Sequence, residues 1–344
     1  MKRYLFFASL PYAYTILRPL QDEIWHRGDE VAWFLESSCE NRLAEKEKHL
    51  KTIKEVMEYN PIAVFAPGNW IYDFFPGIKV SVFHGYAMKK RIETIDDHFT
   101  IRGWFDIYCT QGPSSTPYFK ELEAKHGFFK VYETGWCRVD PFYTQQEAST
   151  TDSHVPTILY SPTFTKGICS ADSLLDVIRQ IAHTKPWKWI ITFHPKLNDP
   201  ALIKKYTELA SHFEHVTFQR NNDGLNTFRK ADVMLCDSSS IIVEFMLLDK
   251  PVVTFRNTHP GNHLIDVLRE EEVCGALETA LTRPKELMDN ILAYTLHHEA
   301  HRNGQNSARV LDAVDDFILN HKGKLKNKPL NLYRKLKIRL RTKW

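Results

Sequence analysis

Residues 231–248 read ADVMLCDSSSIIVEFMLL and contain an apolar run, a polar turn and a second apolar stretch. The run 232–236 predicts a buried strand, and residues 239–248 predict a helix that begins directly after it. A strand that passes through a short polar turn into a helix is the repeating unit of parallel α/β sheets. The stretch therefore predicts an α/β fold, with Asp237 and three serines at the carboxyl end of a strand.

The same alternation of short apolar runs and amphipathic stretches continues on both sides of this unit. The expected strands are residues 4–10, 31–35, 63–66, 79–83, 107–110, 130–134, 157–160, 187–193, 215–218, 232–236 and 251–255. The expected helices are 41–59, 116–125, 171–183 with Ser170 as N-cap, 200–212, 225–230, 239–248 and 306–320. Two doubly wound, Rossmann-like domains that face each other across a cleft follow from this order.

Domain boundaries follow from a polar, aperiodic segment at residues 145–156, which predicts a linker. We expect a first domain, 1–148, and a second domain, 155–305, followed by a closing helix, 306–320, and a tail, 321–344. Two domains also fit the length of 344 residues, which exceeds one ordinary core.

Composition limits the class of protein. The chain is 43% hydrophobic and 25% charged, as in soluble globular proteins. It has no apolar run of the roughly 18 residues that a spanning helix needs, and its N-terminal run, interrupted by Pro11 and Arg18, predicts a buried strand and not a signal peptide. Six cysteines without a C-x-x-C pair exclude a zinc ribbon and favour a reducing cytoplasm over a disulfide framework.

Two histidines follow expected strands, at the edge where open α/β sheets bind ligands. His84 comes after 79–83 and precedes Gly85, which permits a sharp turn and close ligand approach. An imidazole there can take a proton from a hydroxyl nucleophile, or simply bond a loop carbonyl. His194 comes after 187–193 and can donate to a phosphate oxygen, or simply end its strand in a His-Pro turn.

The serine turn is a candidate anion site, because helix N–H groups and hydroxyls both donate hydrogen bonds. Its members are Asp237, Ser238, Ser239 and Ser240. Ordinary N-capping is the alternative, although one cap needs one such residue. Glu244, one turn into the expected helix, is a candidate ligand of ribose hydroxyls or else a solvent-facing carboxylate.

Weaker candidates flank the linker. Arg138 is placed to clamp a phosphate or to pair with Asp140, and Thr163 follows a strand as a hydroxyl donor. The sequence has no G-x-G-x-x-G, Walker loop or H-E-x-x-H motif, which argues against dinucleotide oxidoreductases, P-loop kinases and zincins.

The tail is the basic part of the chain. Residues 321–344 carry ten Lys and Arg and no acidic residue, which leaves 35 basic and 42 acidic residues, a net −7, in the rest. Tyr333, Leu336, Leu340 and Trp344 alternate with these cations at helical spacing. Such a tail favours association with an anionic membrane surface over a solvated or nucleic-acid-binding tail.

In order along the chain, the motifs resemble those of the CDP-glycerol glycerophosphotransferases, the teichoic-acid primases and polymerases. They are HG-x-x-x-KK from 84, G-x-x-R-x-D from 135, Y-x-P-T from 160, HP at 194, D-x-S-S from 237 with a following acidic residue and KP, and NGQNSARV at 303–310. The resemblance implies a GT-B fold with an acceptor-side domain at 1–148 and a nucleotide-donor-binding domain at 155–305. It also implies a cytidine nucleotide in the second domain, and no cofactor or catalytic metal.

Carried over by position, the resemblance makes His84 the general base and His194 the phosphate-binding histidine. The other matching positions are Gly85, Lys89, Arg138, Asp140, Thr163, Asp237, Ser239 and Ser240. The departures are Phe83 for Trp, Tyr86-Ala87 for Thr-Pro, Thr165 for Arg, Ser238 for Tyr and Glu244 for Asp. The departures beside His84 bear on the identity of the acceptor. The departures at 165, 238 and 244 bear on the identity of the donor.

The expected activity is transfer of glycerol phosphate, or a related alditol phosphate, from a CDP-activated donor to a saccharide or lipid-linked hydroxyl. This reaction would serve teichoic-acid or capsule synthesis on the inner face of a bacterial cell membrane, without a nucleic-acid partner. Two alternatives are a CMP-sugar glycosyltransferase of the sialic acid or Kdo kind and a non-catalytic, membrane-associated nucleotide-sugar binding protein.

Overall fold

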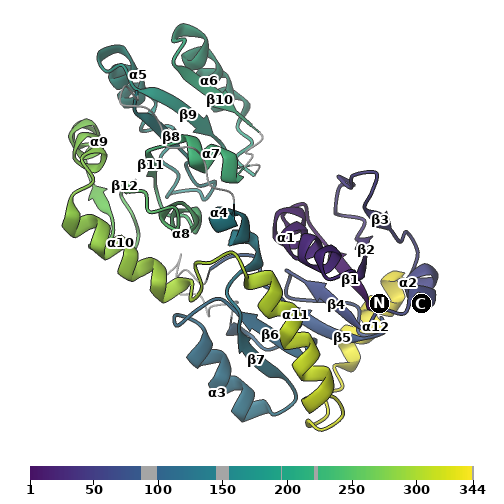
Figure 1. The fold of residues 1–344 in the computed structure, drawn as a ribbon. Helices are drawn as coiled ribbons and strands as arrows, with labels where there is room; N and C mark the ends of the chain where they lie inside the picture. Colours follow the sequence, from purple (N-terminus) through teal and green to yellow (C-terminus); the bar gives the residue numbers. More distant parts are fainter. Residues whose placement is uncertain (87–98, 145–154, 195, 221–223, 343–344) are drawn as a thin grey trace. The chain divides into compact units, whose positions relative to one another are not determined.

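The computed structural model describes residues 1–86, 99–144, 155–194, 196–220 and 224–342 (Figure 1). They form two compact units: unit 1 contains the described parts of 1–145 and residues 296–342, and unit 2 contains the described parts of 155–295. Residues 296–305, expected in the second domain, belong to unit 1 together with the closing helix and the tail.

Unit 1 contains a parallel sheet of order β3-β2-β1-β4-β5-β6-β7. Its strands are β1 Arg3–Ala8, β2 Glu30–Leu35, β3 Lys48–His49, β4 Ala63–Ala66, β5 Ile78–Ser81, β6 Ile107–Thr110 and β7 Lys130–Glu133. Its helical elements are α1 Tyr12–His26, α2 Ile53–Tyr59, α3 Thr116–His126, η2 Cys137–Val139, α4 Asp140–Thr144, α11 Asn306–Asp316, η4 Phe317–His321 and α12 Leu332–Thr342. The strand order reverses between β1 and β4, and the carboxyl ends of strands at such a reversal are where open α/β sheets bind ligands.

Both faces of this sheet are buried, because successive side chains of a strand point to opposite sides. Leu5 and Phe7 belong to a core that includes residues of α2 and α3 and that Ile338 of α12 contacts. On the opposite side, Phe6 packs against Trp33, whose indole nitrogen donates to Gln21 of α1 at 2.6 Å. Near-continuous apolar strands of this kind are typical of parallel sheets.

Unit 2 contains a parallel sheet of order β10-β9-β8-β11-β12-β13. Its strands are β8 Thr157–Tyr160, β9 Lys188–Thr192, β10 Val216–Gln219, β11 Val233–Cys236, β12 Val252–Phe255 and β13 Ile265–Val267. Its helical elements are α5 Leu175–Thr184, α6 Pro200–His212, α7 Gly224–Lys230, α8 Ile241–Met246, η3 Glu270–Glu272, α9 Val273–Leu281 and α10 Lys285–His298, whose last turn leads into unit 1. Here the order reverses between β8 and β11, directly before Thr163 and Asp237.

The predicted strands are all present, with ends shifted by at most two residues. Three helix predictions are wrong in extent. Of 41–59 only Ile53–Tyr59 is helical, because Lys48–His49 pairs with β2 as strand β3. The helix predicted from 171 begins at Leu175, and the helix predicted at 239–248 is the six-residue α8.

Candidate functional site

Candidate residues gather at the carboxyl edge of each sheet, and the two groups are described separately. In unit 2, Asp237 is fully buried and accepts hydrogen bonds from the backbone N–H of Thr163 at 2.8 Å and of Ser170 at 3.0 Å. The Ser170 hydroxyl also donates to it, and Ser170 is not the helix cap that was predicted, because α5 begins at Leu175 with Leu174 as its N-cap residue. Burial raises the pKa of Asp237, and these hydrogen bonds oppose the rise. The Asp237 carboxylate thus connects the loops after β8 and β11, and its place in a phosphate site stays a prediction.

The serines that follow Asp237 divide into two kinds. Ser238 is buried and accepts from the Thr258 N–H at 2.8 Å, so it anchors the loop after β12. Ser239 and Ser240 are half-buried at the start of α8. Ser240 is the N-cap residue, yet among the described residues its hydroxyl makes no capping hydrogen bond. This argues against capping as the reason for the third serine.

His194 is exposed at the end of β9, and its ring state is set by a backbone group. The Lys196 N–H donates to Nδ1 at 3.0 Å, so the proton of the neutral ring lies on Nε2. The ring centroid lies 4.4 Å from that of Phe164, and the Lys196 ammonium lies 5.2 Å from the Phe164 centroid. This corner of unit 2 therefore combines an N–H donor, a cation and an aromatic face.

Glu244 is buried in α8, with an exposed fraction of 9%. It is therefore not a solvent-facing carboxylate, which was the alternative to ribose binding. Thr163 is also buried at the reversal of the strand order. The chemistry available at this edge is donation from hydroxyls and an imidazole, which suits a phosphate, together with a carboxylate that suits sugar hydroxyls.

In unit 1, His84 is exposed at the carboxyl edge of β5. Its Nδ1 lies 3.3 Å from the Pro67 carbonyl oxygen, a contact that requires the proton on Nδ1. Nε2 then carries the lone pair, so the ring is set to accept a proton, in contrast to His194. The Tyr12 ring lies 5.4 Å from that of His84, and a Cβ at Gly68 would lie 3.4 Å from Ser9 Oγ.

The backbone directly before His84 is strained. Phe83 has a φ of 56°, a conformation that costs a bulky residue about 1–3 kcal/mol and that clusters at functional sites. Its carbonyl accepts from the Trp136 indole N–H at 3.3 Å, and its ring packs 5.2 Å from Phe119. The carbonyl of Gly85 accepts from Gln111 at 2.9 Å. Contacts on both sides of His84 thus hold the turn.

Glu299 is a fully buried carboxylate that supports the turn at His84 through hydrogen bonds. It accepts from the Tyr86 hydroxyl at 2.8 Å, the Trp136 N–H at 3.1 Å and the Asn306 amide at 3.2 Å. Burial raises the pKa of Glu299 to about 8. Gly135 permits this packing, because its φ is 74° and a Cβ there would lie 2.4 Å from Glu299 Oε1.

The motif around residue 138 is joined to the closing helix. Asp140 is buried and accepts from the N–H groups of Asn306 at 2.8 Å and Ser307 at 2.7 Å, at the start of α11. Asp140 therefore caps α11. The Arg138 guanidinium lies 5.7 Å from the Trp136 ring centroid. Lys89 lies outside the described residues, as do most of the predicted linker and Trp344.

Several site residues were missed at the sequence level. Glu299 and Gln111 support the His84 turn from distant parts of the chain, and no sequence spacing links them to it. Ser9 directly follows β1, which ends at Ala8, but the predicted strand 4–10 included it, so it had no strand-end signal. The Thr258 side chain donates to Ser238 Oγ at 3.2 Å from the loop after β12, which the sequence indicated only as a turn.

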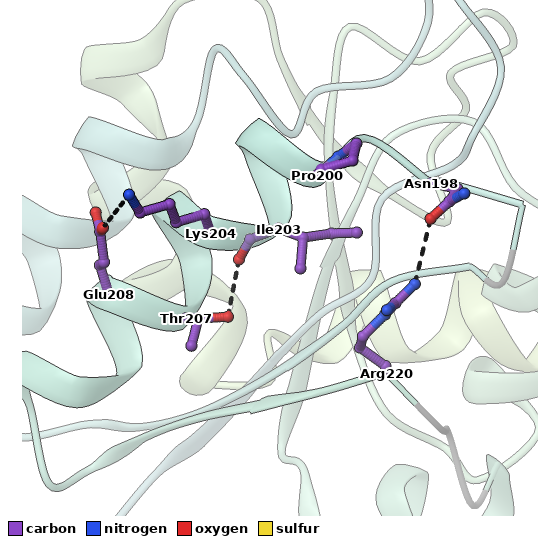
Figure 2. Close-up of a pocket in the computed structure, with 7 residues that line it drawn as sticks. All are labelled: Asn198, Pro200, Ile203, Lys204, Thr207, Glu208 and Arg220. Atoms are coloured by element: carbon purple, nitrogen blue, oxygen red, sulfur yellow. Dashed lines mark hydrogen bonds and ion pairs between the residues drawn. The ribbon is translucent and has the colours of Figure 1, made fainter.

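A surface hollow of about 450 Å³ lies elsewhere on unit 2, along α6 and the end of β10 (Figure 2). Its lining includes Ile203, Lys204 and Arg220, and Arg220 donates to Asn198 at 3.4 Å. The hollow contains none of the predicted site residues. In the described part of the chain no helix is both long and apolar enough to cross a membrane.

Comparison with known proteins decides the family. Residues 105–316 match the family of CDP-glycerol:poly(glycerophosphate) glycerophosphotransferases. The chain belongs to this family. The resemblance inferred from the motifs is confirmed, and the chain is a CDP-glycerol glycerophosphotransferase-type transferase. A search of curated proteins finds no match.

Solved structures show that the fold is of the predicted GT-B type. A variant of the wall teichoic acid polymerase TagF is 12% identical with a TM-score of 0.63, covering 93% of this chain and 90% of that one. Another TagF variant, soaked with CDPG, is 12% identical with a TM-score of 0.61, covering 93% and 89%. A putative UDP-N-acetylglucosamine 2-epimerase from Listeria monocytogenes is 14% identical with a TM-score of 0.60, covering 93% and 97%.

Proposed function

We propose that this family member transfers glycerol phosphate from a CDP-linked donor to a hydroxyl of a lipid-linked saccharide, with His84 as the base and His194 as the phosphate ligand. The observation that carries the proposal is the opposite ring state of the two histidines. The Pro67 carbonyl fixes the proton of His84 on Nδ1, whereas the Lys196 N–H leaves the proton of His194 on Nε2. One ring is thereby set to accept a proton and the other to donate a hydrogen bond.

The reaction follows from these roles. His84 Nε2 takes the proton of the acceptor hydroxyl, and the oxygen attacks the phosphorus that carries glycerol. A new P–O bond forms, the P–O bond to CMP breaks, and CMP leaves with the electron pair. Hydrogen bonds from His194, Ser239 and Ser240 offset the negative charge on the phosphates, and Glu244 accepts from the ribose hydroxyls.

The donor class has a direct test. The protein is incubated with CDP-glycerol, CDP-ribitol or CMP-sialic acid, and release of CMP is followed. We expect release from a CDP-alditol, and release from CMP-sialic acid alone would contradict the proposal. The double variant Ser239→Ala/Ser240→Ala should weaken CDP binding in calorimetry, whereas Ser211→Ala, on the exposed end of α6, should not. Unchanged CDP affinity in the double variant would remove these serines from the site.

We propose further that no metal takes part, because neutral donors that are part of the fold supply the charge stabilisation. Activity is then expected to survive EDTA. Complete loss in chelator, restored by Mg²⁺ or Mn²⁺, would refute this part of the proposal.

A peripheral position on the inner face of the cell membrane completes the proposal. Its support is the ten cations of residues 321–344 together with exposed leucines in α12. Each cation near an anionic surface contributes about 1 kcal/mol, and this contribution falls with added salt. Co-sedimentation with phosphatidylglycerol vesicles should therefore weaken, but persist in part, at high salt. Absence of binding at low salt would contradict it.

A further inference from the structure

Helix α12 has its apolar side turned away from the protein. Leu332, Leu336 and Leu340 recur at intervals of four and are 70%, 58% and 72% exposed. The intervening Tyr333 is 80% exposed. A helix on the surface of a soluble protein normally buries its apolar stripe, so this arrangement calls for a further partner.

The inward side of α12 is largely ionic. Arg339 donates to both carboxylate oxygens of Asp73, at 3.0 and 3.2 Å, and the Lys335 ammonium lies 3.6 Å from the same carboxylate. Arg341 pairs with Glu36, whose carboxylate is buried. A bidentate pair and a buried acceptor distinguish these contacts from ordinary surface ion pairs, which contribute little. The helix is therefore docked on unit 1 and is not a loose tail.

The docking contacts lie at the carboxyl edge of the sheet, which also carries His84. Glu36 directly follows β2, and Asp73 belongs to the segment 67–74 that follows β4. This segment begins at Pro67, whose carbonyl contacts His84, and ends where the Arg339 guanidinium lies 5.3 Å from the Phe74 ring centroid. One short segment thus connects the base to α12, which Figure 1 draws in yellow near β4 and β5.

An anionic lipid surface fits the exposed stripe better than a second copy of the chain. Exposed Arg334 and Lys337 flank the leucines, as in helices that lie in the headgroup region. A two-fold dimer through the stripe would bring Arg334 and Lys337 of both copies together, and like charges across an interface oppose association.

We infer that α12 is a rigid lipid-binding platform, which holds the His84 edge of unit 1 against an anionic bilayer and suits an acceptor whose reacting hydroxyl lies close to the headgroups. The inference rests on the proposed membrane association and deepens it. A flexible tether would bring the protein to the membrane in any orientation, whereas a docked platform presents one edge.

The main test variant undocks α12 by a substitution outside the tail, and a second variant restores the ion pair. Asp73→Arg places a cation among Lys335, Arg339 and Arg341, and the swap Asp73→Arg/Arg339→Asp restores an ion pair. The matched control is Asp315→Arg, which breaks the exposed Lys2–Asp315 pair of unit 1. All variants are compared by co-sedimentation with phosphatidylglycerol vesicles and by hydrogen exchange of residues 67–74 with and without vesicles.

We expect vesicle binding by every variant. Vesicles should slow hydrogen exchange at 67–74 in the wild type, the swap and the control, but not in Asp73→Arg. We also compare the rate of transfer to a vesicle-bound acceptor with the rate of transfer to a soluble acceptor. The ratio of these two rates should fall roughly tenfold in Asp73→Arg alone, because the protein loses its fixed orientation on the bilayer. If vesicles slow hydrogen exchange at 67–74 in Asp73→Arg as much as in the wild type, the rigid platform is wrong and α12 acts as a flexible tether.

A second variant separates this inference from the proposed enzyme function. Replacing Leu332, Leu336 and Leu340 by serine should abolish the salt-resistant part of vesicle binding. Unchanged binding, or a concentration-dependent dimer that these substitutions dissolve, would overturn the lipid assignment. Transfer to a soluble acceptor, measured in parallel on the wild type, reports on the enzyme itself and fails only if the proposed reaction is wrong.

Discussion

Replacing Glu299 by glutamine is expected to remove a large part of the pH dependence of folding. The carboxylate is fully buried beneath the His84 turn, and the groups that contact it at Tyr86, Trp136 and Asn306 are all hydrogen-bond donors. Burial nevertheless dominates and raises the pKa of Glu299 from 4.5 to about 8. Glutamine has the shape of the protonated acid and does not titrate.

The sign and size of the effect follow from linkage. Between pH 4.5 and about 8 the folded state retains a proton that the unfolded state has released, so stability falls as pH rises through this window. Each pH unit changes the free energy of unfolding by about 1.4 kcal/mol, which sums to about 5 kcal/mol over the window. Asp140, whose pKa is also raised by burial, is present in both proteins and drops out of the comparison.

Urea unfolding of wild type and Glu299→Gln at pH 5, 6, 7 and 8 measures this difference directly. The stability of the variant relative to wild type should increase by about 1.4 kcal/mol per pH unit between pH 5 and 7.5. Glu58→Gln, at an exposed position in α2, is the matched control and should follow the wild type at every pH. If the free energies of unfolding of wild type and Glu299→Gln change with pH in parallel, the reasoning is refuted.

Three further outcomes are expected from the site geometry. Asp237→Asn should lower the free energy of unfolding by about 2 kcal/mol in urea, because an NH₂ group replaces one of the two acceptor oxygens and a donor then faces the Thr163 or the Ser170 N–H; unchanged stability would contradict its role between the loops. Gly135→Ala should destabilise unit 1 by more than about 2 kcal/mol, since φ is 74° and the Cβ would overlap Glu299; a neutral result in thermal unfolding would mean that this packing is adaptable. Trp136→Phe should lower turnover more than it raises KM for the donor, because the indole N–H holds the strained Phe83 carbonyl; a change in KM alone would argue against that support.

The sequence predicted the features that depend on local pattern. Short apolar runs such as Ala63–Ala66 and Ile107–Thr110 are strands as expected, because both faces of a parallel sheet are buried. Strand ends then located His84, His194 and the serine turn. The ring states of the two histidines required the structure, since the proton position on each imidazole depends on the Pro67 carbonyl and the Lys196 N–H.

The features that sequence could not predict depend on contacts between distant residues. The Glu- and Lys-rich segment 41–59 suggested one long helix, yet Glu47 is buried and bound by Arg18 and Gln21, and this holds its surroundings as a loop and a short strand. Ser170 was expected to cap a helix but binds Asp237, 67 residues away. The tail was expected to be a separate amphipathic segment, and Asp73 and Glu36 dock it on unit 1.

The central claim is that His84 removes the proton of the acceptor hydroxyl, and the most direct measurement compares turnover and donor binding in His84→Ala. Removal of a general base should reduce CMP release in the presence of acceptor by roughly 10²- to 10⁴-fold. CDP affinity in calorimetry should stay near that of the wild type, and His212→Ala, an exposed histidine of α6, should retain full activity. If His84→Ala keeps more than about half of the wild-type turnover, well outside the range expected for loss of a base, the claim is contradicted.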